Sequence, residues 1–204
     1  MEEKHQDKQH QDKQLPKILE EVKRHGFVVF TSGEFNLNII AVRNREKVPN
    51  VFNDKIYLCY KRDGAWQEHE FTCTTDPSTY WLNTPMRKDG TAVLMHPQQM
   101  RAAFELGYHK NTYNCLRQVR EVKVWRDNNK DNIIDYGNMT NSRSWGIQIH
   151  RANSKYRSLR VGKYSAGCIV LNDPLQYAKF INIIETSLQI NPTWRRFSVT
   201  LIEG

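Results

Sequence analysis

Residues 55–73 have the sequence KIYLCYKRDGAWQEHEFTC, in which two runs containing aromatic and β-branched residues flank Asp63 and Gly64. An Asp-Gly pair between two such runs is a strong signal for a tight β-hairpin, because both residues tolerate a positive φ. We therefore expect strands over 55–62 and 65–73. This hairpin indicates a chain built mainly from β-strands.

Other segments on both sides of the hairpin also have strand or helix patterns. Apolar runs and alternating patterns predict strands at 27–30, 37–42, 91–95, 119–125, 145–150, 168–171 and 197–201. Apolar spacing, Pro and Gly predict helices at 16–26, 97–106 and 173–191. The predicted fold is mainly β with a few helices, in a single domain over 15–204.

Composition supports a folded domain. The chain has 204 residues, of which 39% are hydrophobic, enough for a core. No run approaches 18 apolar residues, so no membrane span is expected. Residues 1–14, MEEKHQDKQHQDKQ, repeat a polar pentapeptide and lack the apolar segment of an export signal. We expect a disordered tail there.

The formal net charge is +8. A basic surface favours anionic partners, which include nucleic acid, cell-wall polymers and lipopolysaccharide, although it also serves plain solubility. The sequence contains no helix-turn-helix, RNP or zinc-finger pattern, so sequence-specific nucleic-acid binding is not expected.

Four cysteines, Cys59, Cys73, Cys115 and Cys168, are present without a CxxC pair. This excludes a zinc ribbon and a thioredoxin motif. Because no export signal is present, disulfides are not the default expectation. A functional cysteine would then act as a thiol.

The segment that indicates chemistry places His150 at the end of an apolar run and Cys168 after Ser165-Ala-Gly, with fourteen residues between His150 and Ser165. A Cys–His pair can lower the thiol pKa and move a proton during acyl transfer. Amides beside Gly167 could face a developing oxyanion. The alternative is a buried cysteine and an ordinary hydrogen-bonded histidine.

This segment resembles the signature of the L,D-transpeptidase catalytic domain, also called the YkuD domain: a His, then Ser-x-Gly-Cys-[Ile/Val]. Here the matching residues are His150 and the stretch from Ser165 to Ile169. Upstream, Thr84-Pro85 and the stretch from Gly90 to Val93 are also similar. The resemblance implies a YkuD-like β-sandwich or barrel that acts on the peptide stems of peptidoglycan.

Carried over by position, the resemblance makes Cys168 the nucleophile and His150 the base, with the Gly167 and Cys168 amides as the oxyanion hole and Ser165 as a brace. No cofactor is required. Two positions depart from the family pattern: Arg151 replaces a Gly and Val170 replaces an Arg. These departures leave the choice of substrate open.

Four further residues are candidates for substrate binding: Arg151, Trp145, Tyr164 and His109. A basic side chain near the cleft would suit an anionic substrate, and aromatic rings would suit a glycan or peptide groove. The alternatives are a solvated loop for the basic residues and core packing for the aromatic ones.

Residues 127–135 resemble the first part of an EF-hand calcium loop. Asp127, Asn129, Asp131 and Asp135 occupy positions 1, 3, 5 and 9, whereas Asn132 replaces the Gly at position 6. The hypothesis is a structural Ca²⁺ site; the alternative is a polar turn with Asx hydrogen bonds.

Two classes of function remain open. The first is a cysteine enzyme that cleaves or exchanges peptidoglycan peptides. The second is a non-catalytic virion or wall-binding protein that retains the fold. The stretches 75–82 and 126–132 are similar to small bacteriophage proteins, which would place an endolysin-like enzyme in the host cytoplasm before release, or in the virion.

Overall fold

The computed structural model describes residues 14–142 and 146–204. Eight strands form a closed mixed barrel in the order β1-β11-β5-β6-β9-β10-β3-β2, and β4, β7 and β8 form a separate small sheet. The barrel strands are β1 (Asn38–Arg43), β2 (Asp54–Arg62), β3 (Ala65–Thr74), β5 (Gln98–His109), β6 (Tyr113–Gln118), β9 (Gln148–Arg151), β10 (Ile169–Leu171) and β11 (Phe197–Glu203). The small sheet contains β4 (Thr91–Leu94), β7 (Val122–Asp127) and β8 (Asn138–Ser142). The predicted mainly β single domain is confirmed.

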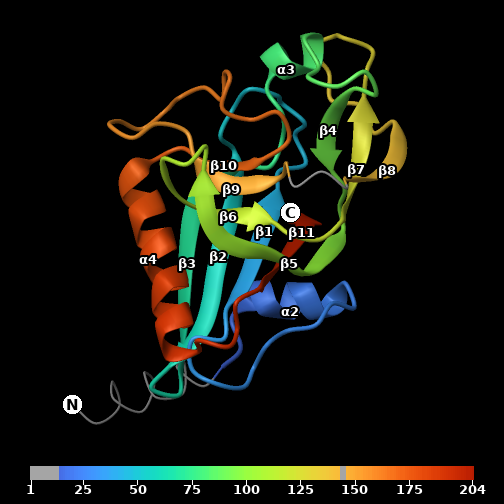
Figure 1. Cartoon of the computed structure of the whole chain (residues 1–204). Helices are drawn as coiled ribbons and strands as arrows, with labels where there is room; N and C mark the ends of the chain where they lie inside the picture. Colours follow the sequence, from blue (N-terminus) through green and yellow to red (C-terminus); the bar gives the residue numbers. More distant parts are fainter. Residues whose placement is uncertain (1–13, 143–145) are drawn as a thin grey trace, which may run out of the picture.

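The expected hairpin is confirmed. β2 and β3 pair antiparallel from Asp54 opposite Cys73 to Arg62 opposite Ala65. Asp63 has φ of 53° and Gly64 has φ of 75°, which is the backbone a two-residue turn requires. The hairpin forms one continuous side of the barrel (Figure 1).

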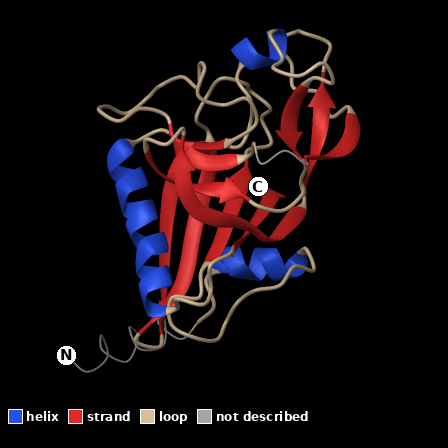
Figure 2. Ribbon diagram, in the orientation of Figure 1, coloured by secondary structure: helices blue, strands red, loops and turns tan. Residues whose placement is uncertain are grey.

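Two longer helices pack against opposite faces of the barrel strands. α4 (Pro174–Ile190) lies along β3, β9 and β10, and Asp173 caps its first turn by accepting from the Leu175 N–H at 2.8 Å (Figure 1). Its buried residues include Tyr177, Phe180 and Ile184, which join the main core. α2 (Lys17–Arg24) packs Leu19 and Val22 on the barrel's other side (Figure 2). Both helices were expected from their apolar spacing.

A buried arginine side chain helps to join the small sheet to the barrel. Arg43, at the end of β1, is fully buried and donates from Nη1 to the Leu94 carbonyl of β4 at 2.8 Å. Its Nε faces an Asp76 carboxylate oxygen at 2.9 Å, and Nη2 donates to the Thr75 carbonyl at 2.9 Å. Through Arg43, β1, β4 and the segment after β3 are held together.

Two segment predictions were wrong. Residues 97–106 lie in β5 rather than in a helix. Residues 27–30 form no strand; instead the Gln99 side chain bonds the Val28 N–H and carbonyl at 3.2 and 2.7 Å, and the Asn38 side chain bonds those of Phe30 at 2.8 and 2.9 Å. Side-chain amides thus satisfy the backbone groups that a neighbouring strand would otherwise bond. The sequence also did not predict β6, β8 or the short α3 (Thr79–Asn83).

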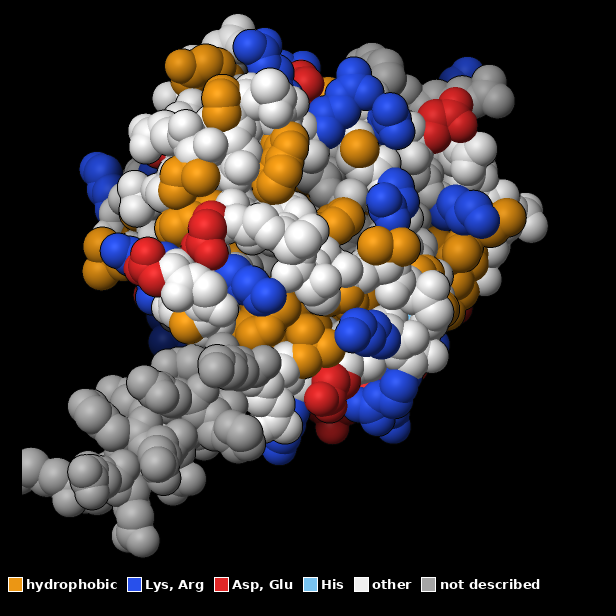
Figure 3. All heavy atoms as spheres, turned by 90° about the horizontal axis from the view of Figure 1, so that it is seen from below, with side chains coloured by type: hydrophobic (Ala, Val, Ile, Leu, Met, Phe, Trp, Pro, Cys, Tyr) orange, Lys and Arg blue, Asp and Glu red, His pale blue; other side chains and the backbone are white. Residues whose placement is uncertain are grey.

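On the face seen from below, Lys and Arg side chains are dispersed among apolar and acidic ones (Figure 3). Within the residues that the structure describes, no helix combines the length and apolar character needed to cross a bilayer. The tail predicted at 1–14 falls, apart from its last residue, outside the described residues.

Candidate functional site

The parallel pair β9 and β10 brings the two sequence candidates together. Ile149 pairs with Ile169 and His150 pairs with Val170. Cys168 lies one position before β10, so it aligns with Gln148, and alternation along the strands places its side chain on the same face as Gln148 and His150. The Ile pair on the other face is buried in the core.

The loop before Cys168 is held by its own hydrogen bonds. Ser165 is buried; its hydroxyl donates to the Cys168 carbonyl at 2.8 Å and accepts from the Gly167 N–H at 3.2 Å. The Ser165 carbonyl accepts from the Ser78 N–H at 3.0 Å. The Gly167 amide is therefore used inside the loop in this conformation, and the Cys168 amide is left as the expected oxyanion donor.

Gly167 allows the loop to pass close to β4. Its φ is 121°, and a Cβ there would lie 2.5 Å from the Ala92 carbonyl oxygen. Only glycine fits this backbone and this gap. The close approach makes β4 one wall of the site.

His150 is held in one tautomer. Its Nδ1–H donates to the Arg151 carbonyl at 2.9 Å, which also accepts from the Tyr113 hydroxyl at 3.3 Å. The Nε2 atom is thus the unprotonated nitrogen. Burial lowers the pKa of His150 to about 4, with smaller contributions from His109 and Lys110 and against the opposing hydrogen bond to the Arg151 carbonyl, so the ring is neutral at pH 7.

A second histidine lies against the first. The His109 ring stacks on the His150 ring with centroids 4.4 Å apart and an interplanar angle of 23°. The His109 Nδ1–H donates to the Gln148 side-chain oxygen at 2.5 Å. Gln148 therefore fixes His109, and His109 fixes one face of the candidate base.

Cys168 is half-buried, and its thiol donates to the Gly146 carbonyl at 3.5 Å. Burial raises the pKa of the Cys168 thiol to about 11, against the opposing effects of the Gln148 backbone N–H and the Lys110 charge. This shift is opposite in direction to the lowered thiol pKa expected from a Cys–His pair. Cys59, Cys73 and Cys115 are fully buried, and their thiol pKa values are raised further.

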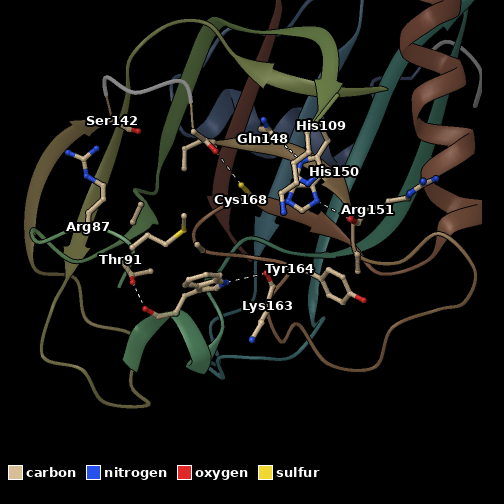
Figure 4. A pocket seen from close by; sticks show the side chains of 18 of the residues that line it. Arg87, Thr91, His109, Ser142, Gln148, His150, Arg151, Lys163, Tyr164 and Cys168 are labelled. Atoms are coloured by element: carbon tan, nitrogen blue, oxygen red, sulfur yellow. Dashed lines mark hydrogen bonds between the residues drawn. The ribbon is translucent and has the colours of Figure 1, made fainter. Parts of the chain in front are cut away.

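The Cys168 sulfur and the His150 ring open into a cavity of about 710 Å³ (Figure 4). Three of the four predicted substrate-binding residues line it: His109, Arg151 and Tyr164. The Arg151 guanidinium lies 4.1 Å from the centre of the Tyr113 ring. The fourth, Trp145, lies outside the described residues.

The sequence did not identify several residues that line this cavity. They include Lys110, Gln148 and Thr91, whose hydroxyl donates to the Trp81 carbonyl at 2.5 Å. Lys110 was missed because 97–106 was predicted as a helix, which concealed the β5–β6 turn. Val170 is fully buried and does not line the cavity.

The predicted calcium loop has an arrangement different from an EF-hand. The positive φ falls on Lys130, at 62°, and not on Asn132. The Asn129 amide nitrogen donates to Asp131 at 3.0 Å and to Asp135 at 2.5 Å. Asp127 accepts from the Asp135 N–H at 2.8 Å.

Within residues 14–142 and 146–204, no group of three His, Cys, Asp or Glu side chains is arranged to hold a metal ion. The hydrogen bonds of this loop match the Asx-turn alternative. The Ca²⁺ site at Asp127, Asn129, Asp131 and Asp135 stays a prediction, without support from this geometry.

Comparison with known proteins does not assign a family: no family model, no curated protein and no solved structure matches this chain.

Proposed function

We propose that the protein is a cysteine acyl-transfer enzyme of the L,D-transpeptidase type that acts on the peptide stems of peptidoglycan. The observation that carries the proposal is the Cys168 and His150 pair on one face of β9 and β10, opening into a cavity. A Cys nucleophile beside a neutral His is the arrangement that acyl transfer needs. The proposal includes the finer, YkuD-like description of the barrel.

The proposed reaction begins with both groups uncharged. As the Cys168 sulfur attacks a substrate carbonyl carbon, its proton passes to Nε2 of His150, and the carbonyl oxygen becomes an oxyanion. When that intermediate collapses, the C–N bond breaks and the leaving amine takes the proton from His150. The product is an acyl-enzyme thioester. Water or an acceptor amine then releases it, with His150 again moving the proton.

The raised thiol pKa makes His150 essential in this scheme. Since a thiol with a pKa of about 11 is protonated at pH 7, deprotonation must accompany attack. The Arg151 carbonyl keeps the proton on Nδ1 of His150, so Nε2 can accept the thiol proton.

A non-catalytic wall-binding or virion protein is the second candidate. It is favoured by the same thiol pKa and by the Gly167 amide, which bonds Ser165 instead of facing the cavity. In this second proposal, the cavity binds anionic cell-wall material and catalyses no reaction.

The test compares wild type, Cys168→Ala and Cys59→Ala on purified peptidoglycan, with muropeptides identified by mass spectrometry. Cys59 is a matched control because it is buried beside α2, away from the cavity. We expect altered stems with wild type and with Cys59→Ala, and a loss of at least 1,000-fold in rate with Cys168→Ala. The product masses would name the bond and the acceptor. If none of the three proteins alters the stems while all bind the wall, the catalytic proposal is wrong and the binding role stands.

A further inference from the structure

The charged side chains that line the cavity are positive. None of the described residues that line it is acidic. Five of them are basic: Arg87, Lys110, Arg126, Arg151 and Lys163. The sequence from 136 to 172, which supplies the nucleophile and the base, contains no Asp or Glu. An anionic group entering the cavity therefore meets no acidic side chain of the described lining.

Four of the five basic side chains already have partners. Arg87 and Arg126 both face Asp89, at 3.0 and 3.5 Å. The Arg151 guanidinium lies on a tyrosine ring, as described above, and the Lys163 ammonium lies 4.5 Å from the centre of the Tyr80 ring. These contacts hold the four side chains in the wall of the cavity.

Lys110 differs from the other four. It is exposed, and within the part of the chain that the structure describes its side chain has no ion pair, hydrogen bond or ring contact. Its ammonium is therefore available to an incoming group. Charged side chains without a partner commonly extend into solvent, so the lack of a partner does not by itself assign Lys110 to a ligand.

The backbone conformation at Lys110 is a second, independent observation. Lys110 and Asn111 are the central residues of a β-turn from His109 to Thr112, within the three-residue connection between β5 and β6; their φ values are 47° and 57°, and the Thr112 N–H donates to the His109 carbonyl at 2.9 Å. Such a turn favours Asn or Gly at both positions, and a lysine at positive φ costs about 1 kcal/mol. This strained lysine directly follows His109, the residue that stacks on the candidate base.

Lys110 also lies within electrostatic reach of both reacting groups. Although burial dominates both pKa values, the Lys110 charge lowers the pKa of the Cys168 thiol and that of the His150 imidazole. Lys110 therefore acts on both reacting groups and lines the same cavity as they do.

We propose that Lys110 binds a carboxylate of the substrate beside the carbonyl that Cys168 attacks, and so determines specificity; this inference rests on the proposed function. An ammonium–carboxylate contact next to the reacting bond would discriminate against an amidated substrate, because the amide would leave Lys110 unpaired. The turn presents Lys110 to the cavity, and the stacked His109 keeps the turn aligned with His150.

The first test uses two reagents that alkylate thiols by the same reaction but differ in charge: iodoacetate, which is an anion, and iodoacetamide, which is neutral. In both, the Cys168 thiolate forms a bond to carbon and iodide leaves, so the ratio of the two rates cancels the thiolate fraction and reports the charge near the sulfur. The rates are measured at Cys168 by peptide mass spectrometry in wild type, Lys110→Met, Lys110→Arg and Lys155→Met. Lys155 is an exposed lysine that does not line the cavity.

We expect the iodoacetate-to-iodoacetamide ratio to fall about fivefold in Lys110→Met, the size of one charge interaction near a protein surface. The ratio should be retained in Lys110→Arg and in Lys155→Met. An unchanged ratio in Lys110→Met would overturn the role of Lys110 and leave the proposed function intact.

The second test does not depend on thiol chemistry. In the Cys168→Ala background, calorimetry measures binding of a stem tetrapeptide and of the same peptide with its carboxylates converted to carboxamides. We expect the carboxylate form to bind at least fivefold more tightly, and Lys110→Met to remove that preference. Equal binding of the two forms overturns the inference. A Cys168 inert to both alkylating reagents counts against the proposed function alone, since this binding test still decides the role of Lys110.

Discussion

At the scale of single residues, the site depends on Gly167. A substitution there has two costs. The φ of 121° would strain the backbone of any other residue, and an added Cβ would lie 2.5 Å from the Ala92 carbonyl oxygen. We expect Gly167→Ala to lower the free energy of unfolding by about 3 kcal/mol or more. It should also move Cys168 away from His150. Urea unfolding gives the first quantity, and the alkylation rate of Cys168 reports the second.

Gly162 is the matched control for this substitution. It also has positive φ, at 52°, but a Cβ there would have no atom within 4 Å. Gly162→Ala should therefore cost only the backbone strain, about 1 kcal/mol, and leave Cys168 reactivity unchanged. Equal destabilisation by the two substitutions would contradict the claim that contact with β4 constrains the nucleophile loop.

The grouping of the candidate site residues could be predicted at this scale, and their electrostatics could not. The order and spacing of His150 and Cys168 predicted two strands of one sheet that bring these residues together, and β9 and β10 lie side by side in that way. The low thiol pKa expected from a Cys–His pair was wrong because burial outweighs the neighbouring charge. Burial depends on the segments packed around a residue, which short-range sequence patterns do not show.

At the scale of elements, the mistaken helix at 97–106 has an identifiable cause. Along β5, Met100, Ala103 and Phe104 are buried, which is the i, i+3, i+4 spacing of a helix face. The spacing arises because β5 bulges at Ala102, whose φ is 46°. Phe197 pairs with Phe104 and Val199 pairs with Met100, so two steps along β11 correspond to four steps along β5. A bulge shifts the alternation of a strand, and a period-based reading then favours a helix.

The attachment of the small sheet to the barrel gives an element-scale prediction. Arg43 bonds the β4 carbonyl of Leu94 and neutralises the buried Asp76. Replacement by Met would remove both contacts and leave the Asp76 carboxylate buried without its cation. We expect Arg43→Met to lower the free energy of unfolding by about 3–5 kcal/mol, measured by urea denaturation at pH 7.

Arg43→Lys separates charge from geometry in this contact. A lysine keeps the positive charge but cannot reach Leu94, Thr75 and Asp76 together, because it lacks the guanidinium fork. The variant should lose an intermediate amount of stability. If Arg43→Met were as stable as wild type, the small sheet would not depend on this side chain.

At the scale of the whole molecule, the mainly β class and the single domain followed from local hairpin and strand signals, whereas barrel closure did not. The parallel pairs β1–β11 and β9–β10 join segments separated by many residues or by an irregular loop. Local patterns predict where a strand lies but not its partner. The cavity is the product of that closure, so its lining by the β5–β6 turn could not be foreseen.

Buried ionisable groups make the stability of the whole molecule depend on pH in opposing ways. Burial lowers the pKa of His150 to about 4, below the ordinary value near 6.5, so the stability from keeping it neutral is present above pH 6.5 and is lost as pH falls toward 4. Burial raises the pKa of Asp76 to about 6, against the opposing charge of Arg43. Its contribution is present below about pH 4 and is lost as pH rises through 6.

Substitution separates these two contributions. Between pH 7.5 and pH 4.5, His150→Gln should lose about 2 kcal/mol less unfolding free energy than wild type, because the variant has no imidazole to protonate on unfolding. Asp76→Asn should lose about 2 kcal/mol more over the same interval, because it lacks the carboxyl that binds a proton more tightly when folded. Urea denaturation at the two pH values measures both differences. Since each comparison is within one variant, the direct cost of the substitution cancels, and equal pH dependence in all three proteins would show that neither group is buried as described.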